Sequence, residues 1–350
     1  MSVPKPSSDD VRWPDEAWIR IALGRRVSVR SLAGVPSPTG GAGLRDVVGV
    51  LQSIDAEPDG SWAILNRTGK TVIVDPAAVV AAKIVPYSPA RLRSASQVDV
   101  ATLEHIAAQA WQPLESAPLG EWVLRAADGF TGRANSVLPL GDPGEALDGA
   151  LAKVVTWYGD RSLLPMIQVP LPVRTNLNDA LAERGWQAYN AVRVMVCDRD
   201  QLLMTGEEKL AEAAPVSVDI AVKPDAAWLA SFRYGDESVP ASAVPIMTKA
   251  DHPVFVSARD ASGMTLAIAR GAIIGRWLGI TAVEVAAPHR RRGLGRLVIN
   301  ALAGYAGGYG CRHVFLQVAH DNLSACALYE RLGFVAHHDY VYRRMILARR

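Results

Sequence analysis

Three consecutive arginines adjoin a Gly-x-Gly in HRRRGLGRL, residues 289–297, between a strand-like run and a segment with helical spacing. Leu294, Leu297, Val298 and Leu302 recur every three to four residues, which predicts a helix that begins at this loop. Backbone N–H groups at a helix N-terminus bind phosphate oxygens, and glycine removes the Cβ that would block their approach. The segment is therefore a candidate phosphate site. A solvated arginine cluster is the simpler alternative, because Gly-x-Gly near a helix start is common.

A second pair of polar side chains lies nearer the C-terminus, in QVAHDNLSACALYERLGF. Asn322 and Tyr329 are seven residues apart, close to two helical turns, so both can face one ligand while Leu328 and Leu332 pack inward. An amide can hydrogen-bond a peptide-like ligand arm, and a phenol can protonate a leaving thiolate. Without the arginine loop, Tyr329 would be interpreted as an ordinary residue of an amphipathic helix.

Glu284 is the only acidic residue in GITAVEVAAP, the strand-like run before the loop, which makes it the candidate general base. Strand alternation could instead turn its side chain away from the acceptor, or make it a structural residue, and both interpretations stay open. His289, His320 and Asp321 are further titratable groups near these motifs, and for each a surface role is the simpler interpretation.

Three segments of the chain must position these residues. Residues 1–18 form a polar leader, and residues 19–86 alternate about five short β-rich runs with turn signals, which predicts a small all-β SH3-like barrel. After a linker, residues 98–200 and residues 216–350 each show a mixed order of strands and helices. The fold class expected for these two segments is α/β (α+β), with mixed sheets flanked by helices.

The arginine loop and the later helix together resemble the GCN5-related N-acetyltransferase (GNAT) family. The family's Arg/Gln-x-x-Gly-x-Gly/Ala loop matches Arg290, Gly293 and Gly295. Its Asn-x-x-Ala-x-x-Leu-Tyr-x-x-x-Gly-Phe pattern matches Asn322, Ala325, Leu328, Tyr329, Gly333 and Phe334. The resemblance implies tandem GNAT folds, with acetyl-CoA as cosubstrate and no metal.

The resemblance also implies a role for each matched residue. The loop amides would hold the pyrophosphate of acetyl-CoA, the pantetheine arm would run beside the strand before the loop, and Tyr329 would act as general acid toward the CoA sulfur. The implied contacts with acetyl-CoA are Val283, Val285, Arg290, Arg291, Arg292, Gly293, Leu294, Gly295, Arg296 and Asn322.

Residues 168–186 repeat the layout of the later motif, which suggests an internal duplication. Ala182 stands where Tyr329 stands in the later copy, and no arginine-glycine loop follows NSVLPL, so residues 98–200 are expected to be a degenerate GNAT-like lobe. GFTGRANSV, residues 129–137, is either a substrate-facing surface or a turn capped by asparagine. The three-part arrangement resembles actinobacterial tandem-GNAT, histone-acetyltransferase-like proteins that carry an N-terminal SH3-like domain.

Composition limits the classes of function. The 350 residues carry 37 Lys and Arg against 35 Asp and Glu, a net charge of +2, which gives no overall case for a nucleic-acid or membrane partner. The three cysteines are scattered, so neither a disulfide framework nor a metal knuckle is expected, and the N-terminus has no signal-peptide pattern, which predicts a cytoplasmic protein.

The expected function is transfer of an acetyl group from acetyl-CoA to a primary amine of a small molecule, a protein lysine or an N-terminus. Direct attack in a ternary complex is expected, because no Cys or Ser with a His partner suggests a covalent intermediate. The alternative is a non-catalytic protein that senses acetyl-CoA or binds a protein partner through the barrel. Nucleic-acid binding through the arginines is a third hypothesis, which the near-neutral net charge and the absence of aromatic residues among the arginines disfavour.

Overall fold

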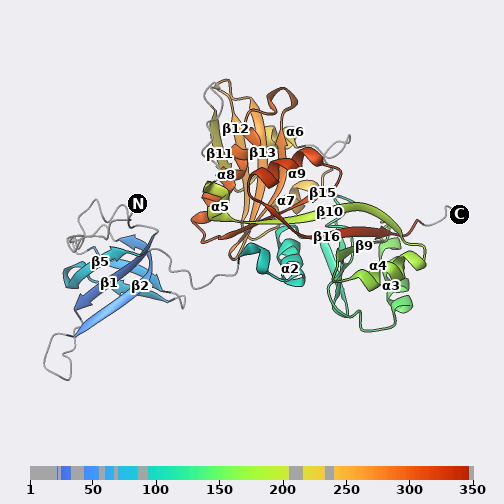
Figure 1. Cartoon of the computed structure of the whole chain (residues 1–350), viewed down its shortest axis with the longest axis horizontal. Helices are drawn as coiled ribbons and strands as arrows, with labels where there is room; N and C mark the ends of the chain where they lie inside the picture. Colours follow the sequence, from blue (N-terminus) through green and yellow to red (C-terminus); the bar gives the residue numbers. More distant parts are fainter. Residues whose placement is uncertain are drawn as a thin grey trace, which may run out of the picture. The chain divides into compact units, whose positions relative to one another are not determined.

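The structure is a computed structural model that describes residues 22, 25–32, 43–54, 60–66, 70–85, 94–204, 216–232 and 240–346. The chain divides into two compact units, Met1–Leu92 and Arg93–Arg350 (Figure 1). The leader predicted for residues 1–18 lies outside the described residues.

The first unit contains one antiparallel sheet. Its strands, in the order in which they pair, are β4 (Thr71–Val74), β3 (Trp62–Asn66), β2 (Leu44–Ile54), β1 (Arg26–Leu32) and β5 (Val79–Ile84). A short 3-10 helix, Pro76–Ala78, connects β4 to β5. Buried Val29, Leu51 and Trp62 belong to its core. In the part of this unit that is described, β4 and β5 do not pair, so the sheet is not seen to close as a barrel.

The second unit has the mixed α/β architecture that the sequence predicts. Its first part consists of α2 (Val100–Ala110), β6 (Glu115–Leu119), β7 (Trp122–Ala126), β8 (Leu138–Pro139), α3 (Leu147–Gly159), β9 (Met166–Leu171), α4 (Thr175–Glu183), β10 (Gln187–Asp198) and α5 (Arg199–Met204). Its second part consists of β11 (Ser217–Ala221), α6 (Ala226–Ser231), α7 (Ala243–Thr248), β12 (Pro253–Arg259), β13 (Thr265–Ile274), β14 (Trp277–Val285), α8 (Leu294–Gly307), β15 (His313–Ala319), α9 (Leu323–Arg331) and β16 (Val335–Arg344).

Both parts contribute strands to one eight-stranded sheet of order β11-β12-β13-β14-β15-β10-β16-β9. β10, from the first part, lies between β15 and β16 of the second, and Val194 is paired with Gln317 on one side and with His338 on the other. β16 in turn lies between β10 and β9. A fragment that began at residue 216 would lose β10 and leave β15 and β16 without their shared neighbour, so the two segments predicted as lobes are joined by a continuous sheet.

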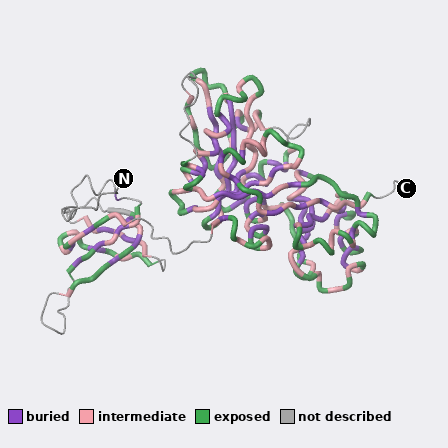
Figure 2. Tube along the Cα trace, in the orientation of Figure 1, coloured by how far each residue is buried: buried purple, intermediate pink, exposed green. Residues whose placement is uncertain are grey.

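Helices cover both faces of this sheet (Figure 1). One face, the α8 face, packs against α5, α8 and α9 through a core that includes Ile280, Leu316 and Val298. The opposite face, the α2 face, packs against α2, α6 and α7 through two clusters to which Phe315 and Ile268 belong. Figure 2 shows the buried residues concentrated along the strands between these layers. No helix in the described ranges is long and apolar enough to cross a membrane.

Candidate active site

The centre of the site is a gap between β14 and β15. The two strands run parallel and pair from Trp277–His313 to Ile280–Leu316. β14 then continues to Val285 and β15 to Ala319, with no further pairs between them among the described residues. Peptide groups along the open edge of β14 can therefore hydrogen-bond an extended ligand.

A β-bulge in β14 lies at the start of this gap. Two residues of β14, Ala282 and Val283, stand opposite Ala269 alone, and Ala282 has a φ of 53°. A bulge bends its strand and redirects the side chains that follow it. Val283 and Val285 pack into the α8-face core, whereas Glu284 pairs with Ile268, which belongs to the α2-face core. Glu284 therefore points toward the α2 face.

The arginine-glycine loop forms the N-terminus of α8. Gly293 is its N-cap with a φ of 83°, a left-handed conformation that favours glycine. Arg290, Arg291 and Arg292 are exposed, and Arg290 Nε donates to the Val285 carbonyl oxygen at 3.3 Å. The first-turn N–H groups have no partner within an α-helix and carry the positive end of its dipole. The loop thus combines backbone donors with guanidinium charge at the end of the gap.

The two glycines of the motif differ in role. Gly293 is exposed, whereas Gly295 is buried, and a Cβ built on Gly295 would lie 3.2 Å from Leu328 Cδ2 and 3.8 Å from Val285 Cγ2. The absence of a side chain at Gly295 therefore lets α8 approach α9 and β14 closely. Only its backbone N–H remains available for a ligand.

Tyr329 lies on the α8 face, where its ring meets Phe334 edge to face at 5.9 Å between centroids. Burial raises the pKa of Tyr329 to about 12, and the negative charge of Glu284 contributes to the same shift. The phenol therefore keeps its proton at neutral pH, and Tyr329 and Glu284 lie within electrostatic reach of each other across the sheet.

Asn322 is the N-cap of α9, and its Oδ1 accepts hydrogen bonds from Ala325 N at 3.2 Å and Ser324 Oγ at 3.1 Å. The capping role did not appear in the sequence argument, which assigned this amide to the pantetheine arm. The two roles are compatible, because capping uses Oδ1 and leaves the Nδ2 donor for a ligand.

Two substitutions at Asn322 separate these roles. Asn322→Ser keeps a capping oxygen, whereas Asn322→Ala removes it, so only the alanine variant should lose about 1 kcal/mol of unfolding free energy. If Nδ2 binds the pantetheine arm, both variants should raise the Michaelis constant for acetyl-CoA by about 3- to 10-fold, the effect of one neutral hydrogen bond. Denaturant unfolding and steady-state kinetics measure the two effects. A serine variant with an unchanged Michaelis constant would leave Asn322 as a cap alone.

The loop of residues 129–137 borders the gap on the α2 face. Asn135 organises it internally, since Oδ1 accepts from Ala127 N at 2.8 Å and Gly129 N at 3.0 Å. Arg133 Nη1 reaches from this loop to Gln317 Oε1 on β15 at 2.9 Å. Both sequence interpretations of the segment, a turn organised by asparagine and a surface near the site, are therefore compatible with the structure.

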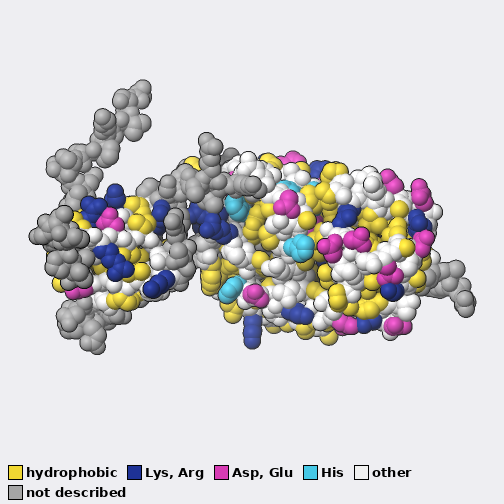
Figure 3. Space-filling view, turned by 90° about the horizontal axis from the view of Figure 1, so that it is seen from below, with side chains coloured by type: hydrophobic (Ala, Val, Ile, Leu, Met, Phe, Trp, Pro, Cys, Tyr) yellow, Lys and Arg dark blue, Asp and Glu magenta, His cyan; other side chains and the backbone are white. Residues whose placement is uncertain are grey.

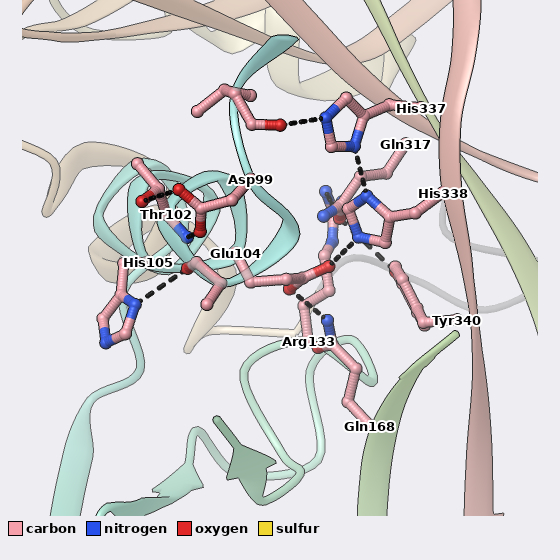
Figure 4. Close-up of polar contacts among 12 residues, drawn as sticks. Asp99, Thr102, Glu104, His105, Arg133, Gln168, Gln317, His337, His338 and Tyr340 are labelled. Carbon is pink, nitrogen blue, oxygen red and sulfur yellow. Dashed lines mark hydrogen bonds and ion pairs between the residues drawn. The ribbon is translucent and has the colours of Figure 1, made fainter. Parts of the chain in front are cut away.

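A buried polar cluster lies beside this loop. Figure 4 shows Glu104 reaching from α2 to His338, with Gln168 on its other oxygen and Arg133 pointing toward Gln317. Sequence reasoning missed this cluster, because its members come from α2, β9, β15, β16 and the loop of residues 129–137. The sequence does carry a signal for a separate buried charge on the same face, Arg270, which is a charged residue inside the apolar strand TLAIARGAII.

The other titratable candidates take part in contacts of their own. His289 Nδ1 lies 3.1 Å from Arg292 Nη1, and His320 Nε2 lies 3.2 Å from Asp339 Oδ1. Asp321 is exposed. These contacts do not bring any of the three side chains into the gap between β14 and β15. Within the described ranges, no group of three or more His, Cys, Asp or Glu side chains is arranged to hold a metal ion.

The profile of the family described as "Probable histone acetyltransferase Rv0428c C-terminal" matches residues 97–343. The chain belongs to this family. A family relative, "Probable histone acetyltransferase Rv0428c" from Mycobacterium tuberculosis, is 30% identical over 337 residues, which cover 94% of this chain and 95% of the relative. "Uncharacterized N-acetyltransferase YobR" from Bacillus subtilis is 26% identical over 258 residues, which cover 70% of this chain and 99% of that protein.

The fold of this family member agrees with the GNAT resemblance. A "GCN5-related N-acetyltransferase from Kribbella flavida" matches with a TM-score of 0.54 at 18% identity, over 72% of this chain and 97% of the other. The resemblance to GNAT proteins is therefore confirmed, and by family and fold the protein is a GNAT-type N-acetyltransferase.

Proposed function

We propose that the protein transfers the acetyl group of acetyl-CoA to a primary amine by direct attack within a ternary complex. The observation that carries this proposal is the gap between β14 and β15, which leads at one end to the N-terminus of α8 and its three exposed arginines. Beyond the bulge at Ala282, β14 offers about 7 Å of extended edge from Val283 to Val285, at about 3.3 Å per residue. An extended acyl-carrying arm fits such an edge, with its phosphates at the loop.

The phosphates of acetyl-CoA would contact the first-turn amides of α8, Leu294 to Arg296, and the guanidinium groups of Arg290 to Arg292. The arm would lie along Val283 to Val285, and its thioester would reach the bulge region of β14. When bound, acetyl-CoA supplies the activated acyl group. This chain's residues hold it and move protons.

Glu284 and Tyr329 lie on opposite faces of the sheet beside the gap, which suits them to two different proton transfers. Glu284 would take a proton from the ammonium group, so that the neutral amine can attack the thioester carbonyl carbon. As the carbon–sulfur bond breaks, its electron pair stays on sulfur, and Tyr329 would donate a hydrogen bond or proton there. The second proton of the amine is lost as the amide forms and replaces the proton that sulfur takes up through Tyr329, while the proton on Glu284 passes to solvent. The products are the N-acetyl amide and the CoA thiol, and both side chains return to their starting states.

Direct attack is favoured over a covalent acyl-enzyme at either of the two buried cysteines, Cys197 and Cys311. Burial raises the pKa of Cys197 and of Cys311 to about 11 in each case, so both remain protonated at neutral pH and are poor nucleophiles.

The smaller unit supports a further part of the proposal. Its strand order and the 3-10 turn before β5 are compatible with an SH3-like barrel, and we propose a protein partner for it.

In the view of Figure 3, basic and acidic side chains of the second unit are interspersed. With a net charge of +2, this gives no broad basic surface on that face, and we propose a cytoplasmic enzyme without a membrane or nucleic-acid partner.

The full chain tests the function by two measurements, acetyl-CoA binding by calorimetry and CoA release over a panel of amino acids, polyamines, aminoglycosides and lysine peptides. Acetyl-CoA-dependent transfer to at least one amine is the expected result. Binding without transfer to any amine would instead favour the acetyl-CoA sensor.

Gly293 offers a matched test of the phosphate position. Asn and Asp both tolerate left-handed backbone, so Gly293→Asn and Gly293→Asp add similar side chains that differ by one charge. The aspartate variant should bind acetyl-CoA about tenfold or more weakly than the asparagine variant, because its carboxylate repels the phosphates, and salt should narrow the difference. Calorimetry at two salt concentrations measures both effects. Equal affinity of the two variants would place the phosphates elsewhere.

A further inference from the structure

Two arginines border the gap on the α2 face. Arg270 Nη1 donates to Thr281 Oγ1 at 3.3 Å, and Arg133 Nη1 donates to Gln317 Oε1 at 2.9 Å. Thr281 and Gln317 are the first residues of β14 and β15 beyond the last paired residues of these strands. One guanidinium therefore contacts each side of the gap at the point where the strands separate.

Both guanidinium groups lie over the indole ring of Trp111. The guanidinium carbons of Arg270 and Arg133 lie 4.8 and 5.1 Å from the ring centroid of Trp111. Trp111 Nε1 in turn donates to Thr131 Oγ1 at 2.9 Å, which ties the loop of residues 129–137 to this position. The loop thus brings Arg133 close to Arg270, and both positive charges lie near the centre of the site.

Neither arginine forms an ion pair with a carboxylate in the described part of the chain. Arg270 is fully buried, and its other hydrogen bonds go to the carbonyl oxygens of Met247 at 2.7 Å and Ala110 at 3.1 Å. Burial, and then the charge of Arg133, lower the pKa of Arg270 to about 9, so it remains positive at neutral pH. Buried charges in proteins are ordinarily paired, because an unpaired ion loses its hydration without compensation.

The nearby carboxylate does not compensate these charges. Glu104 is the only buried carboxylate among the described residues, and its two oxygens contact Gln168 Nε2 at 2.7 Å and His338 Nε2 at 2.8 Å. The charge of Glu104 influences the pKa of Arg125, a second buried arginine, whereas no carboxylate is among the groups that shift the pKa of Arg270. On the face toward which Glu284 points, the guanidinium groups of Arg133 and Arg270 are therefore not paired with a carboxylate by any contact among the described residues.

We propose that the acceptor is a small amine that also carries a carboxylate, an amino-acid-like molecule. The inference rests on the proposed acetyl transfer. Arg133, which is half-buried, would hydrogen-bond the acceptor carboxylate directly, while Arg270 remains buried and provides positive potential beneath it. The guanidinium fork matches the geometry of a carboxylate. Glu284 would face the ammonium group, so the site would complement both charges of a zwitterion.

The same charges disfavour strongly basic acceptors. A polyamine or a lysine in a basic peptide brings further positive charge toward Arg133 and Arg270, where repulsion is weakly screened because the site is partly buried. The preference therefore separates amino-acid-like acceptors from polycationic ones.

The test compares, on the full chain, α-amino acids with the corresponding α-amino amides, alongside diamines and basic peptides. CoA release gives the rates, and mass spectrometry identifies the N-acetyl product. The carboxylate form of an accepted amine should have a kcat/KM about 10- to 100-fold above that of its amide, as for a charge-assisted hydrogen bond. Arg133→Gln should remove this preference, Arg133→Lys should retain part of it, and acetyl-CoA affinity should stay unchanged in both.

Arg193→Gln is the matched control. Arg193 is also half-buried, and its Nε pairs with Asp339 at 3.2 Å on the neighbouring strand β16. This variant should keep the preference for the carboxylate. The comparison of acid and amide on the wild-type chain needs no variant, so it stands even if a substitution at Arg133 prevents folding.

The possible outcomes separate this inference from the function on which it rests. Equal rates for acid and amide, or faster transfer to diamines and basic peptides, would overturn the inference while the transfer itself upholds the enzyme. A loss of acetyl-CoA affinity in Arg133→Gln would make Arg133 a residue of the donor site and would overturn it as well. Acetyl-CoA binding without transfer to any amine would overturn both proposals.

Discussion

Replacement of Glu284 by glutamine is expected to lower turnover at neutral pH by about 10²- to 10⁴-fold, the usual contribution of a general base. The substitution preserves shape and hydrogen-bonding capacity but removes the group that accepts the ammonium proton. Raising the pH should narrow the deficit, because solvent then deprotonates the amine before it binds. Turnover measured against pH at saturating acetyl-CoA tests this.

The control for this variant is Glu330→Gln, which makes the same chemical change at an exposed position of α9, next to Tyr329. It should leave turnover near the wild-type value. A Glu284→Gln variant with full turnover, or with a deficit that is constant with pH, would return Glu284 to the structural role that the sequence left open.

Tyr329→Phe should lower turnover by about 10²-fold or somewhat more, while acetyl-CoA affinity barely changes. The ring and its contact with Phe334 remain, and only the donor is lost. The lower part of the range for general acids is expected, because the pKa of Tyr329 is raised to about 12 and an ordinary thiol has a pKa of about 8.5. Full proton transfer to the CoA thiolate is then uphill, so a hydrogen bond to the developing charge accounts for the effect.

The pH dependence adds a second readout for Tyr329. A raised pKa means that the phenol remains protonated until the pH approaches 12. Wild type and Tyr329→Phe should therefore show the same profile of turnover between about pH 6 and pH 10, displaced by a constant factor. Tyr305→Phe is the control, because it removes a hydroxyl from α8 that contacts the Tyr309 hydroxyl at 3.0 Å. Full turnover in Tyr329→Phe would make Tyr329 a packing residue.

The sequence was sufficient to predict local structure wherever the residues concerned lie close together in the chain. The arginine-glycine loop lies within six residues, and its conformation follows from glycine at a left-handed position before an amphipathic helix. The spacing of Asn322 and Tyr329 likewise follows from the pitch of a single helix, α9, which Asn322 caps. These local patterns were enough to indicate the family, because neither depends on how distant segments pair.

Only the tertiary structure showed the features that depend on strand register between distant segments, namely the shared sheet and the side on which Glu284 lies. The duplication in the sequence suggested two lobes in succession, but β10 pairs with both β15 and β16, and hydrogen bonding between strands is not encoded in the spacing of either strand. The side on which Glu284 lies follows from a bulge at Ala282, where one extra residue reverses the alternation, and a single sequence does not reveal its position.

The same reason applies to the charges of the site. By itself the sequence predicted a phosphate role for the arginine-glycine loop and an acid role for Tyr329, and it indicated the family. It gave no sign that Arg133, Arg270 and Trp111 meet, because they come from a loop, a buried strand and the end of a helix, separated by up to 159 positions. Only the folded sheet brings these two arginines to the opening between β14 and β15, since their contacts arise from strand pairing and helix packing over long sequence separations.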